Sequence, residues 1–345
     1  YLNVDPWTMS PFQHGEVFVT EDGTETDLDL GHYERFLDVP LTELSSFTSW
    51  KLYEDLIHRE RRGDFLGGTV QIVPHLTDLV KEKIRDGYKT AEADISIVEI
   101  WGTVGDMENE YILESARQIR TELGSENVIF VHVALLPFLL ASKELKTKPI
   151  QHSIRTLMGY GIVPDFLVVR ADSAIPDDTL DKIARASGLP RHHVLGSPTL
   201  DSIYRVPIEY AKDHIGESIV EALSLIEKTP DLGNWERLVK NIDASIDIVR
   251  IGMIGKYIEL EDAYYSVNEA MKSAGFSFQK KIKLVFIEAE EIEKKGISIL
   301  EDLDGICVPW WFGGRGIEGM ILAAQYARTR GIPYLGICLW SQIMA

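Results

Sequence analysis

Short runs of β-branched and apolar residues alternate along this chain with longer segments of helical periodicity, and this alternation constrains the fold most strongly. Strands are predicted at residues 95–100, 127–136, 165–171, 192–197, 247–256, 281–289, 303–310 and 333–338. Helices are predicted between them, at residues 109–123, 177–187, 261–275 and 319–331 among others. Because parallel strands need a long crossover connection, this order predicts an α/β protein whose parallel sheets carry helices on both faces.

The series of strands and helices is interrupted once. With 345 residues, 45% of them hydrophobic, the chain can build two packed cores. After residue 208 the sequence becomes helical and polar, and a second series begins at residue 247. We therefore expect a first domain at 1–208, a helical linker at 209–246 and a second, incomplete domain at 247–345. Both ends are expected to be truncations, since Tyr1 enters mid-pattern and Ala345 falls in a helix's first turn.

Charge and cysteine content exclude several classes of protein. A net charge of −19 argues against a protein that coats nucleic acid, although a local nucleotide pocket stays possible. The apolar runs are far too short to span a membrane, and no signal peptide is expected from the pattern of the first residues. Cys307 and Cys338 are the only cysteines, so no disulfide framework is expected and a cytoplasmic location is predicted.

The segment PYLGIC, residues 333–338, is a candidate for presenting a nucleophile. An apolar strand ends at a glycine, and a cysteine follows where the next helix should begin. Such a bend holds a nucleophile on a strained backbone beside the N–H groups of the helix start. An inert, buried Cys338 is the alternative. The glycine-rich segment 308–319 is likewise either an anion cradle or an ordinary loop.

Acidic residues are placed where a divalent cation could bind. Asp27 and Asp29 alternate in a segment taken as extended, so they are expected to share a face. Glu99 ends a predicted strand, and Asp106 and Glu108 lie beyond it. Carboxylates at the carboxyl edge of a parallel sheet can hold Mg²⁺ beside nucleotide phosphates. Solvated acidic loops in an acidic protein are the alternative.

Long segments of the sequence resemble the CTP synthase family. These segments are YLNVDPWTMSPFQHGEVFVTEDGTETDLDLGHYERFL, RRGDFLGGTVQIVPH, KTKPIQHS, GKYIELEDAYYSV and PYLGIC. The resemblance runs from Tyr1 to Ala345. It implies a P-loop-type amidoligase domain followed by a flavodoxin-like class I glutamine amidotransferase domain. It also implies a cytoplasmic homotetrameric ligase that uses ATP and Mg²⁺ to phosphorylate the uracil O4 of UTP, and ammonia from glutamine to displace the phosphate.

The resemblance also implies roles for individual residues. It gives Cys338 as the nucleophile, Asp29 and Glu99 as Mg²⁺ ligands, and His14 as a residue near the ammonia path. Glutamine-contacting residues would be Trp311, Leu339, Trp340, Ser341 and Gln342. ATP would contact Asp29, Pro198, Thr199 and Leu200. The UTP/CTP site would comprise Asp106, Met107, Glu108, Lys146, Thr147, Lys148, Pro149, Ile150, Gln151 and Lys182. CTP would be the feedback inhibitor and GTP the allosteric activator.

The sequence also departs from the family's pattern. The phosphate-binding glycine loop and the His and Glu partners of the cysteine would lie outside residues 1–345. Family glycines are replaced by Trp7, Trp50, Trp101, Trp310 and Trp340; Trp311 is a sixth unusual tryptophan, and Ser341 replaces a usual methionine. A tryptophan at a tight-turn glycine is expected to cost about 1–3 kcal/mol of backbone strain and to fill the adjacent pocket.

Three explanations of these tryptophans stay open: they disable the enzyme, the sites are rebuilt around them, or the printed sequence does not represent those positions. Two other functions are therefore weighed beside the enzyme. One is a catalytically silent scaffold that still binds nucleotide or assembles with active subunits. The other keeps only the fold, as an amidoligase-like P-loop ATPase fused to an unrelated domain, although KTKPIQ speaks against it.

Overall fold

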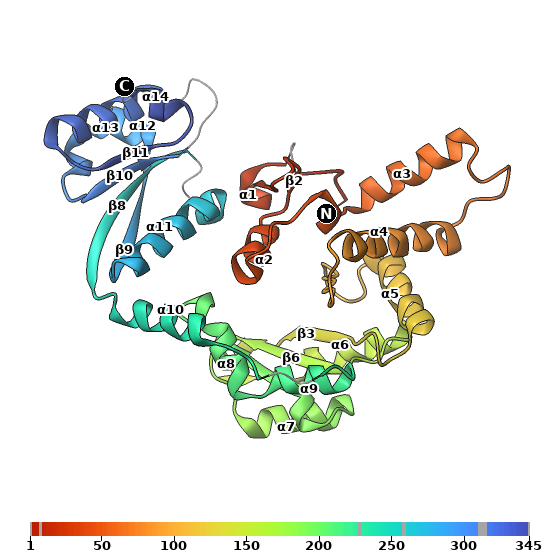
Figure 1. Ribbon diagram of the computed structural model, residues 1–345. Coiled ribbons are helices and arrows are strands. Elements are labelled where there is room, and N and C mark those ends of the chain that lie inside the picture. Colours follow the sequence, from red (N-terminus) through yellow and green to blue (C-terminus); the bar gives the residue numbers. More distant parts are fainter. Residues whose placement is uncertain (1, 7–8, 227–228, 257–259, 310–315, 344–345) are drawn as a thin grey trace. The chain divides into compact units, whose positions relative to one another are not determined.

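A computed structural model describes residues 2–6, 9–226, 229–256, 260–309 and 316–343 (Figure 1). The chain forms two compact units, and each is described by itself. The first unit comprises Tyr1–Val4 and Phe47–Glu236, and the second comprises Asp5–Ser46 and Arg237–Ala345. The N-terminal segment 5–46 thus packs with the C-terminal part of the chain rather than with the residues that follow it.

The first unit contains a three-stranded parallel sheet and helices α3 to α9. Its helices are α3 (Ser49–Arg62), α4 (Thr77–Thr90), α5 (Glu110–Leu123), α6 (Lys148–Gly159), α7 (Asp177–Ser187), α8 (Val206–Lys212) and α9 (Ile215–Ala222). Its strands are β3 (Val131–Leu135), β4 (Phe138–Leu139), β5 (Glu144–Leu145), β6 (Phe166–Ala171) and β7 (Val194–Pro198). Helix α10 (Gly233–Ala244) crosses the boundary between the two units.

The sheet of the first unit has the order β3-β6-β7, all parallel. One face is packed by α6 and α7, which bury Ile150, Ile154 and Ile183 against Leu167 and Val169. This burial follows from the alternation of side chains along a strand and from the 3.6-residue period of the helices. The other face of β3 is open among the described residues, since its alternate side chains are exposed. The prediction of helices on both faces is therefore wrong for this strand.

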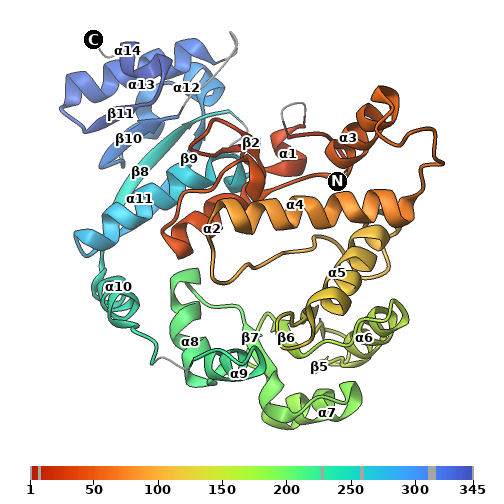
Figure 2. The same cartoon turned by 45° about the vertical axis from the view of Figure 1, so that its right-hand side comes forward.

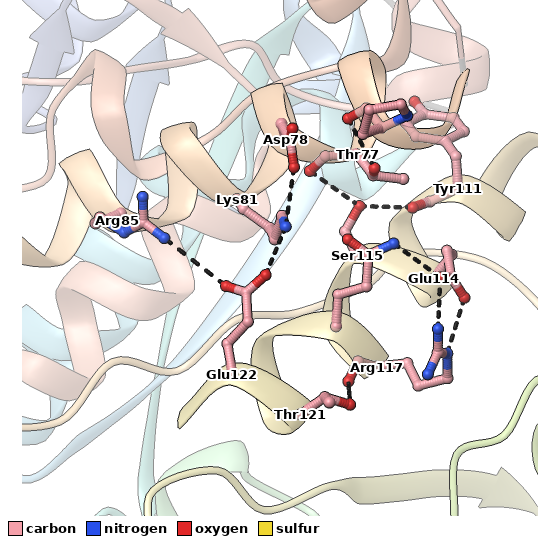
Figure 3. A network of polar contacts seen from close by, with 12 residues as sticks. Thr77, Asp78, Lys81, Arg85, Tyr111, Glu114, Ser115, Arg117, Thr121 and Glu122 are labelled. Atoms are coloured by element: carbon pink, nitrogen blue, oxygen red, sulfur yellow. Dashed lines mark hydrogen bonds and ion pairs between the residues drawn. The ribbon is translucent and has the colours of Figure 1, made fainter. Parts of the chain in front are cut away.

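Helices α4 and α5 are joined by a network of polar contacts (Figure 3). Lys81 Nζ on α4 lies 2.9 Å from Asp78 Oδ1 and 2.7 Å from Glu122 Oε1 on α5. The buried Ser115 hydroxyl donates to the Tyr111 carbonyl oxygen at 2.7 Å, while Tyr111 Oη donates to Ser49 Oγ at the start of α3 at 2.8 Å. Beside these contacts, the apolar faces of the three helices form a separate small core.

The second unit holds the other parallel sheet. Its N-terminal segment forms α1 (Pro11–His14), β1 (Phe18–Val19), β2 (Glu25–Thr26) and α2 (Asp29–Leu37). Its C-terminal part forms β8 (Asp247–Gly255), α11 (Tyr265–Ser277), β9 (Lys280–Glu288), α12 (Ala289–Lys295), β10 (Gly305–Val308), α13 (Ile317–Arg330), β11 (Tyr334–Gly336) and α14 (Leu339–Ile343). The strand order is β11-β10-β8-β9. Figure 2 shows α11 lying along β9.

Both faces of this second sheet are covered, as predicted. Ile254 and Ile306 face the core built with α12 and α13, whereas the neighbouring Met253 and Cys307 face the α11 side. This alternation is the two-residue period of a strand that is buried on both sides. The α/β class with two parallel sheets is thereby confirmed.

The predicted strand at 95–100 is absent. Residues 95–100 form no ladder with any strand among the described residues, and Ile95 and Ile97 are exposed. The run has the β-branched composition of a strand, but a strand exists only where a neighbour accepts and donates its backbone hydrogen bonds. Glu99 consequently lies in an irregular segment and not at a strand's end.

Candidate functional site

Cys338 stands between β11 and α14 in the strand–turn–helix bend that the sequence predicts. Its φ is 62°, a left-handed conformation that a residue other than glycine adopts at some cost. The turn is held by the Cys338 carbonyl oxygen, which accepts from Ser341 N at 3.1 Å and from Ser341 Oγ at 2.7 Å. A Cβ on Gly336 would lie 2.4 Å from the Trp340 carbonyl group. The glycine that the bend requires is therefore Gly336.

The two cysteines have opposite environments. Cys338 is exposed, so the alternative of a buried, inert cysteine does not apply to it. Cys307 is fully buried in β10, and burial raises the pKa of its thiol to about 11. The thiolate is the reactive form, and Cys307 forms little of it at neutral pH.

Alkylation is expected to separate the two thiols. Brief treatment of the folded protein with iodoacetamide near pH 8 should modify Cys338 and leave Cys307 unmodified, because only Cys338 is accessible. Peptide mass spectrometry measures the two sites separately, and unfolding in urea should make both react. Equal modification of both cysteines in the folded state would contradict the placement of Cys307.

The residues after Cys338 divide between solvent and core. Leu339, Ser341 and Gln342 are exposed beside the cysteine. Trp340 is 0% exposed and packs in the core with residues of α12 and α13. The indole is therefore part of the core, and the expectation that it fills a pocket beside the cysteine stays a prediction. Trp311 lies outside the described residues.

Backbone strain is also absent at the tryptophans that the structure describes. Trp50 lies in the first turn of α3 and Trp340 in α14, both helical, and Trp101 has no positive φ either. Trp50 and Trp101 are exposed. The predicted cost of a tight-turn glycine is therefore wrong at these three positions, since positive φ falls instead on Gly102, Gly105 and Cys338. Trp7 and Trp310 lie outside the described residues, as do residues 310–315 of the glycine-rich segment 308–319.

A carboxylate pair lies at the start of α2 in the second unit. The prediction that Asp27 and Asp29 share one face of an extended segment is wrong, because β2 ends at Thr26 and α2 begins at Asp29. Burial raises the pKa of Asp29, and the negative charge of Asp27 raises it further. Asp27 Oδ2 lies 3.2 Å from Nε2 of the buried His14. Two half-buried carboxylates whose negative charges repel each other make a suitable place for a cation.

The chemistry of this pair fits Mg²⁺ without forming a complete metal site. Mg²⁺ takes oxygen ligands and is commonly bound by one or two carboxylates together with phosphate and water. Among the described residues, no group of three or more His, Cys, Asp or Glu side chains is arranged to hold a metal ion. Asp29 belongs to the second unit and Glu99 to the first. Ligands from a nucleotide would have to complete the coordination.

The segment 106–108 is an exposed turn of the first unit. Asp106 Oδ2 accepts from Thr103 N at 3.0 Å, and Met107 and Glu108 begin a short 3₁₀ helix, Met107–Asn109. All three predicted residues are accessible to a ligand. The turn therefore presents two carboxylates and one apolar side chain to solvent.

Positive charge gathers around Glu144, near the start of α6. Lys146 forms an ion pair with Glu144, and Lys182 lies near enough to contribute to lowering the pKa of Glu144. Lys148 Nζ donates to Gln151 Oε1 at 3.2 Å in the first turn of α6. Pro149 occupies the start of this helix, while Thr147 and Ile150 are buried. Lysines at a helix N-terminus form a suitable place for an anion, provided that Lys146 exchanges Glu144 for the ligand.

A small cavity of about 110 Å³ lies at the carboxyl end of β7. It is lined by Gly196, Ser197, Pro198, Leu200, Val206, Glu209, Tyr210, Lys212 and Asp213. Two of the four residues predicted to contact ATP, Pro198 and Leu200, thus line it. Thr199 N donates to the Ala171 carbonyl oxygen at 2.8 Å, and Asp29 belongs to the second unit. The lining residues from 209 onwards were not predicted because residues 209–246 were taken as linker, and Val206 at the end of the predicted first domain was not singled out. The sequence signal that could have found them is their spacing of three or four residues, as in Val206 and Tyr210, which places side chains on one face of a helix.

Two family models match the chain. The family "CTP synthase N-terminus" matches residues 1–225, and "Glutamine amidotransferase class-I" matches residues 259–345. A CTP synthase of Mycoplasma capricolum is 53% identical over 344 residues, which is 99% of this chain and 65% of that protein. A CTP synthase of Dehalococcoides mccartyi is 49% identical over 345 residues, which is 100% of this chain and 63% of that protein. The chain thus spans less than two-thirds of the length of these relatives.

One solved structure is also similar to part of the chain. It is the glutaminase domain of Trypanosoma brucei CTPS with bound acivicin, 36% identical, with a TM-score of 0.26. The match covers 28% of this chain and 38% of that one. Among the helices that the structure describes, none has the length and apolar character needed to cross a membrane.

Proposed function

This chain belongs to the CTP synthase family, and on that premise we propose that it catalyses the ATP-dependent amination of UTP to CTP, with glutamine or ammonia as nitrogen donor. The observation that carries the proposal is the exposed Cys338 on its left-handed bend, within a segment that matches the class I glutamine amidotransferases. We further propose domains at 1–208 and 247–345, joined by a helical linker at 209–246.

Cys338 would act as the nucleophile towards glutamine. Its thiolate would attack the side-chain amide carbon, and the C–N bond would break as the nitrogen takes up a proton and leaves as ammonia. Water would then hydrolyse the thioester to glutamate and free the thiol. Leu339, Ser341 and Gln342 are exposed beside it and would contact the substrate. Trp340 would contribute only through its backbone, because its ring is buried. The proposal also keeps Trp311 as a glutamine-contacting residue.

The first unit would bind the nucleotides. Lys146, Lys148 and Lys182, with the start of α6, would hold the triphosphate of UTP or CTP, together with Thr147, Pro149, Ile150 and Gln151. The turn at 106–108 would recognise CTP, and Pro198–Leu200 would contact ATP beside the cavity at β7. Asp29 and Glu99 would hold Mg²⁺, which would neutralise charge during phosphoryl transfer. GTP activation, a cytoplasmic homotetramer and a role for His14 on the ammonia path belong to the same proposal.

The test is CTP formation by the purified full-length protein, followed by its absorbance change or by chromatography. UTP, ATP and Mg²⁺ with ammonium salt should give CTP, and glutamine should replace ammonium. Asp29→Asn is expected to lower both rates at least about 100-fold if Asp29 is a metal ligand. Binding of UTP and CTP by calorimetry, without any turnover from either nitrogen source, would refute the enzyme and identify a silent nucleotide-binding scaffold.

A further inference from the structure

The N-terminal segment 5–46 is attached to the sheet of the second unit at one small region. Gly15 has φ of 76°, and a Cβ at this position would lie 2.7 Å from Leu28 Cδ2 and 3.2 Å from Asp262 Cβ. The backbone therefore passes closely between these two side chains, where only glycine fits. The next residue, Glu16, donates its N–H to the Asp262 carbonyl oxygen at 2.9 Å. The segment thus meets the chain just before α11.

The side chain of Glu16 completes this attachment. Its Oε2 accepts from the backbone N–H of Ser266 at 2.6 Å, and its Oε1 accepts from the Ser266 hydroxyl. Ser266 is the second residue of α11, so one carboxylate satisfies a backbone N–H that the helix itself leaves unpaired. Hydrogen bonds to a charged acceptor are roughly twice as strong as neutral ones. The two residues are 250 positions apart in the sequence.

Helix α2 contacts the same end of α11. The Arg35 guanidinium lies 5.1 Å from the centre of the Tyr265 ring, and the His32 ring meets that tyrosine edge-on at 4.7 Å. Both residues lie on α2, the helix whose first residue is Asp29. The position of Asp29 is therefore fixed relative to α11 at two places. Leu28 contacts Gly15 just before α2 begins, and His32 and Arg35 contact Tyr265 further along α2.

The attachment and Cys338 lie at different places on the sheet. Helix α11 packs along β9, which is one edge strand, whereas Cys338 follows β11, the opposite edge strand in the order β11-β10-β8-β9. Ile337, the neighbour of Cys338, nevertheless packs in one core cluster with Tyr264 and Val267 of the α11 region. Ammonia-dependent CTP formation and glutamine hydrolysis are therefore both measured, so that an effect on the ligase reaction is separated from an effect on the cysteine bend.

We propose that Glu16 and Ser266 are positioning residues for the ligase reaction, which hold Asp29 in place from the helix α11 of the glutaminase part of the chain. The inference rests on the proposed function, because it takes Asp29 as a ligand of the Mg²⁺ that accompanies ATP. It states that the ligase site is built partly on the glutaminase sheet. A change on α11 should then impair the ligase reaction more than glutamine hydrolysis.

The test compares Ser266→Ala, Glu16→Ala and the double variant in the full-length protein. Each is expected to raise the KM for Mg·ATP in ammonia-dependent CTP formation about tenfold, since small displacements of a catalytic group are costly. Glutamine hydrolysis should stay within twofold of the unchanged protein. The double variant should resemble the single ones, because both remove the same contact. Glu21→Ala, an exposed charge on the same segment, is the matched control.

Hydrogen exchange supplies a readout that does not depend on activity. Backbone amides of residues 14–30 should exchange faster in Ser266→Ala than in the unchanged protein. Their exchange rates should be unchanged in Glu21→Ala. An unchanged KM and unchanged exchange in both contact variants would overturn the inference, and so would an equal fall of ligase and glutaminase rates. Asp29→Asn separates the two proposals: if it leaves CTP formation intact, the assigned role of Asp29 fails; if it abolishes CTP formation while Ser266→Ala has no effect, only the positioning role fails.

Discussion

Replacing Cys338 by alanine is expected to abolish CTP formation from glutamine and to leave CTP formation from ammonia nearly unchanged. The glutamine-dependent rate should fall by at least about 10³-fold, as expected when the nucleophile of a covalent mechanism is removed. Ammonia enters after the thiol has acted, so its rate should change less than about twofold. Alanine tolerates the left-handed backbone of residue 338 about as well as cysteine, which limits any effect on folding.

Cys307→Ala is the matched control for this experiment. Cys307 is fully buried in β10 and faces α11, so its loss should affect stability slightly and glutamine hydrolysis by less than about threefold. The two rates are measured side by side with glutamine and with ammonium salt. Loss of both rates in Cys338→Ala would point to a folding defect, and retention of the glutamine-dependent rate would remove Cys338 from the mechanism.

Replacing Trp340 by alanine is expected to destabilise the second unit by about 3 kcal/mol, near the lower end of the range for a buried aromatic residue. The ring is fully buried in the core between the sheet and helices α12 and α13. The lower end applies because the buried indole Nε1 has no hydrogen-bond partner among the described residues. Removing this N–H relieves the free-energy cost of burying an unsatisfied donor, which offsets part of the lost packing. Urea unfolding followed by circular dichroism measures the change.

Trp50→Ala and Trp101→Ala separate this effect from a general intolerance of tryptophan. Both side chains are at least half exposed, at 50% and 60%, and each change should alter the free energy of unfolding by about 0.5 kcal/mol or less. If Trp340 were instead a strained replacement of a turn glycine, Trp340→Ala would stabilise the protein. That result would reverse the conclusion that the ring is accommodated in the core.

Local sequence patterns predicted most of the elements that surround the site. Helix α7 was predicted at 177–187 and occupies Asp177–Ser187, and the apolar run before Cys338 forms β11 as expected. These elements follow from periodicity and from the glycine and cysteine after the strand. The run at 95–100 has the same composition but no partner strand, and composition carries no information about partners. The roles of Asp29, Glu99 and the residues of α6 stay predictions from family resemblance.

By itself, the sequence determined the α/β class, the bend that carries Cys338 and the membership of the CTP synthase family, because each depends on residues close together along the chain. The tertiary structure alone decided that Cys338 is exposed while Cys307 is buried, and that the ring of Trp340 enters the core. It also joined Glu16 to Ser266, across 250 residues. Burial and long-range contacts depend on which surfaces pack together when the chain folds, and a local sequence pattern does not specify that packing.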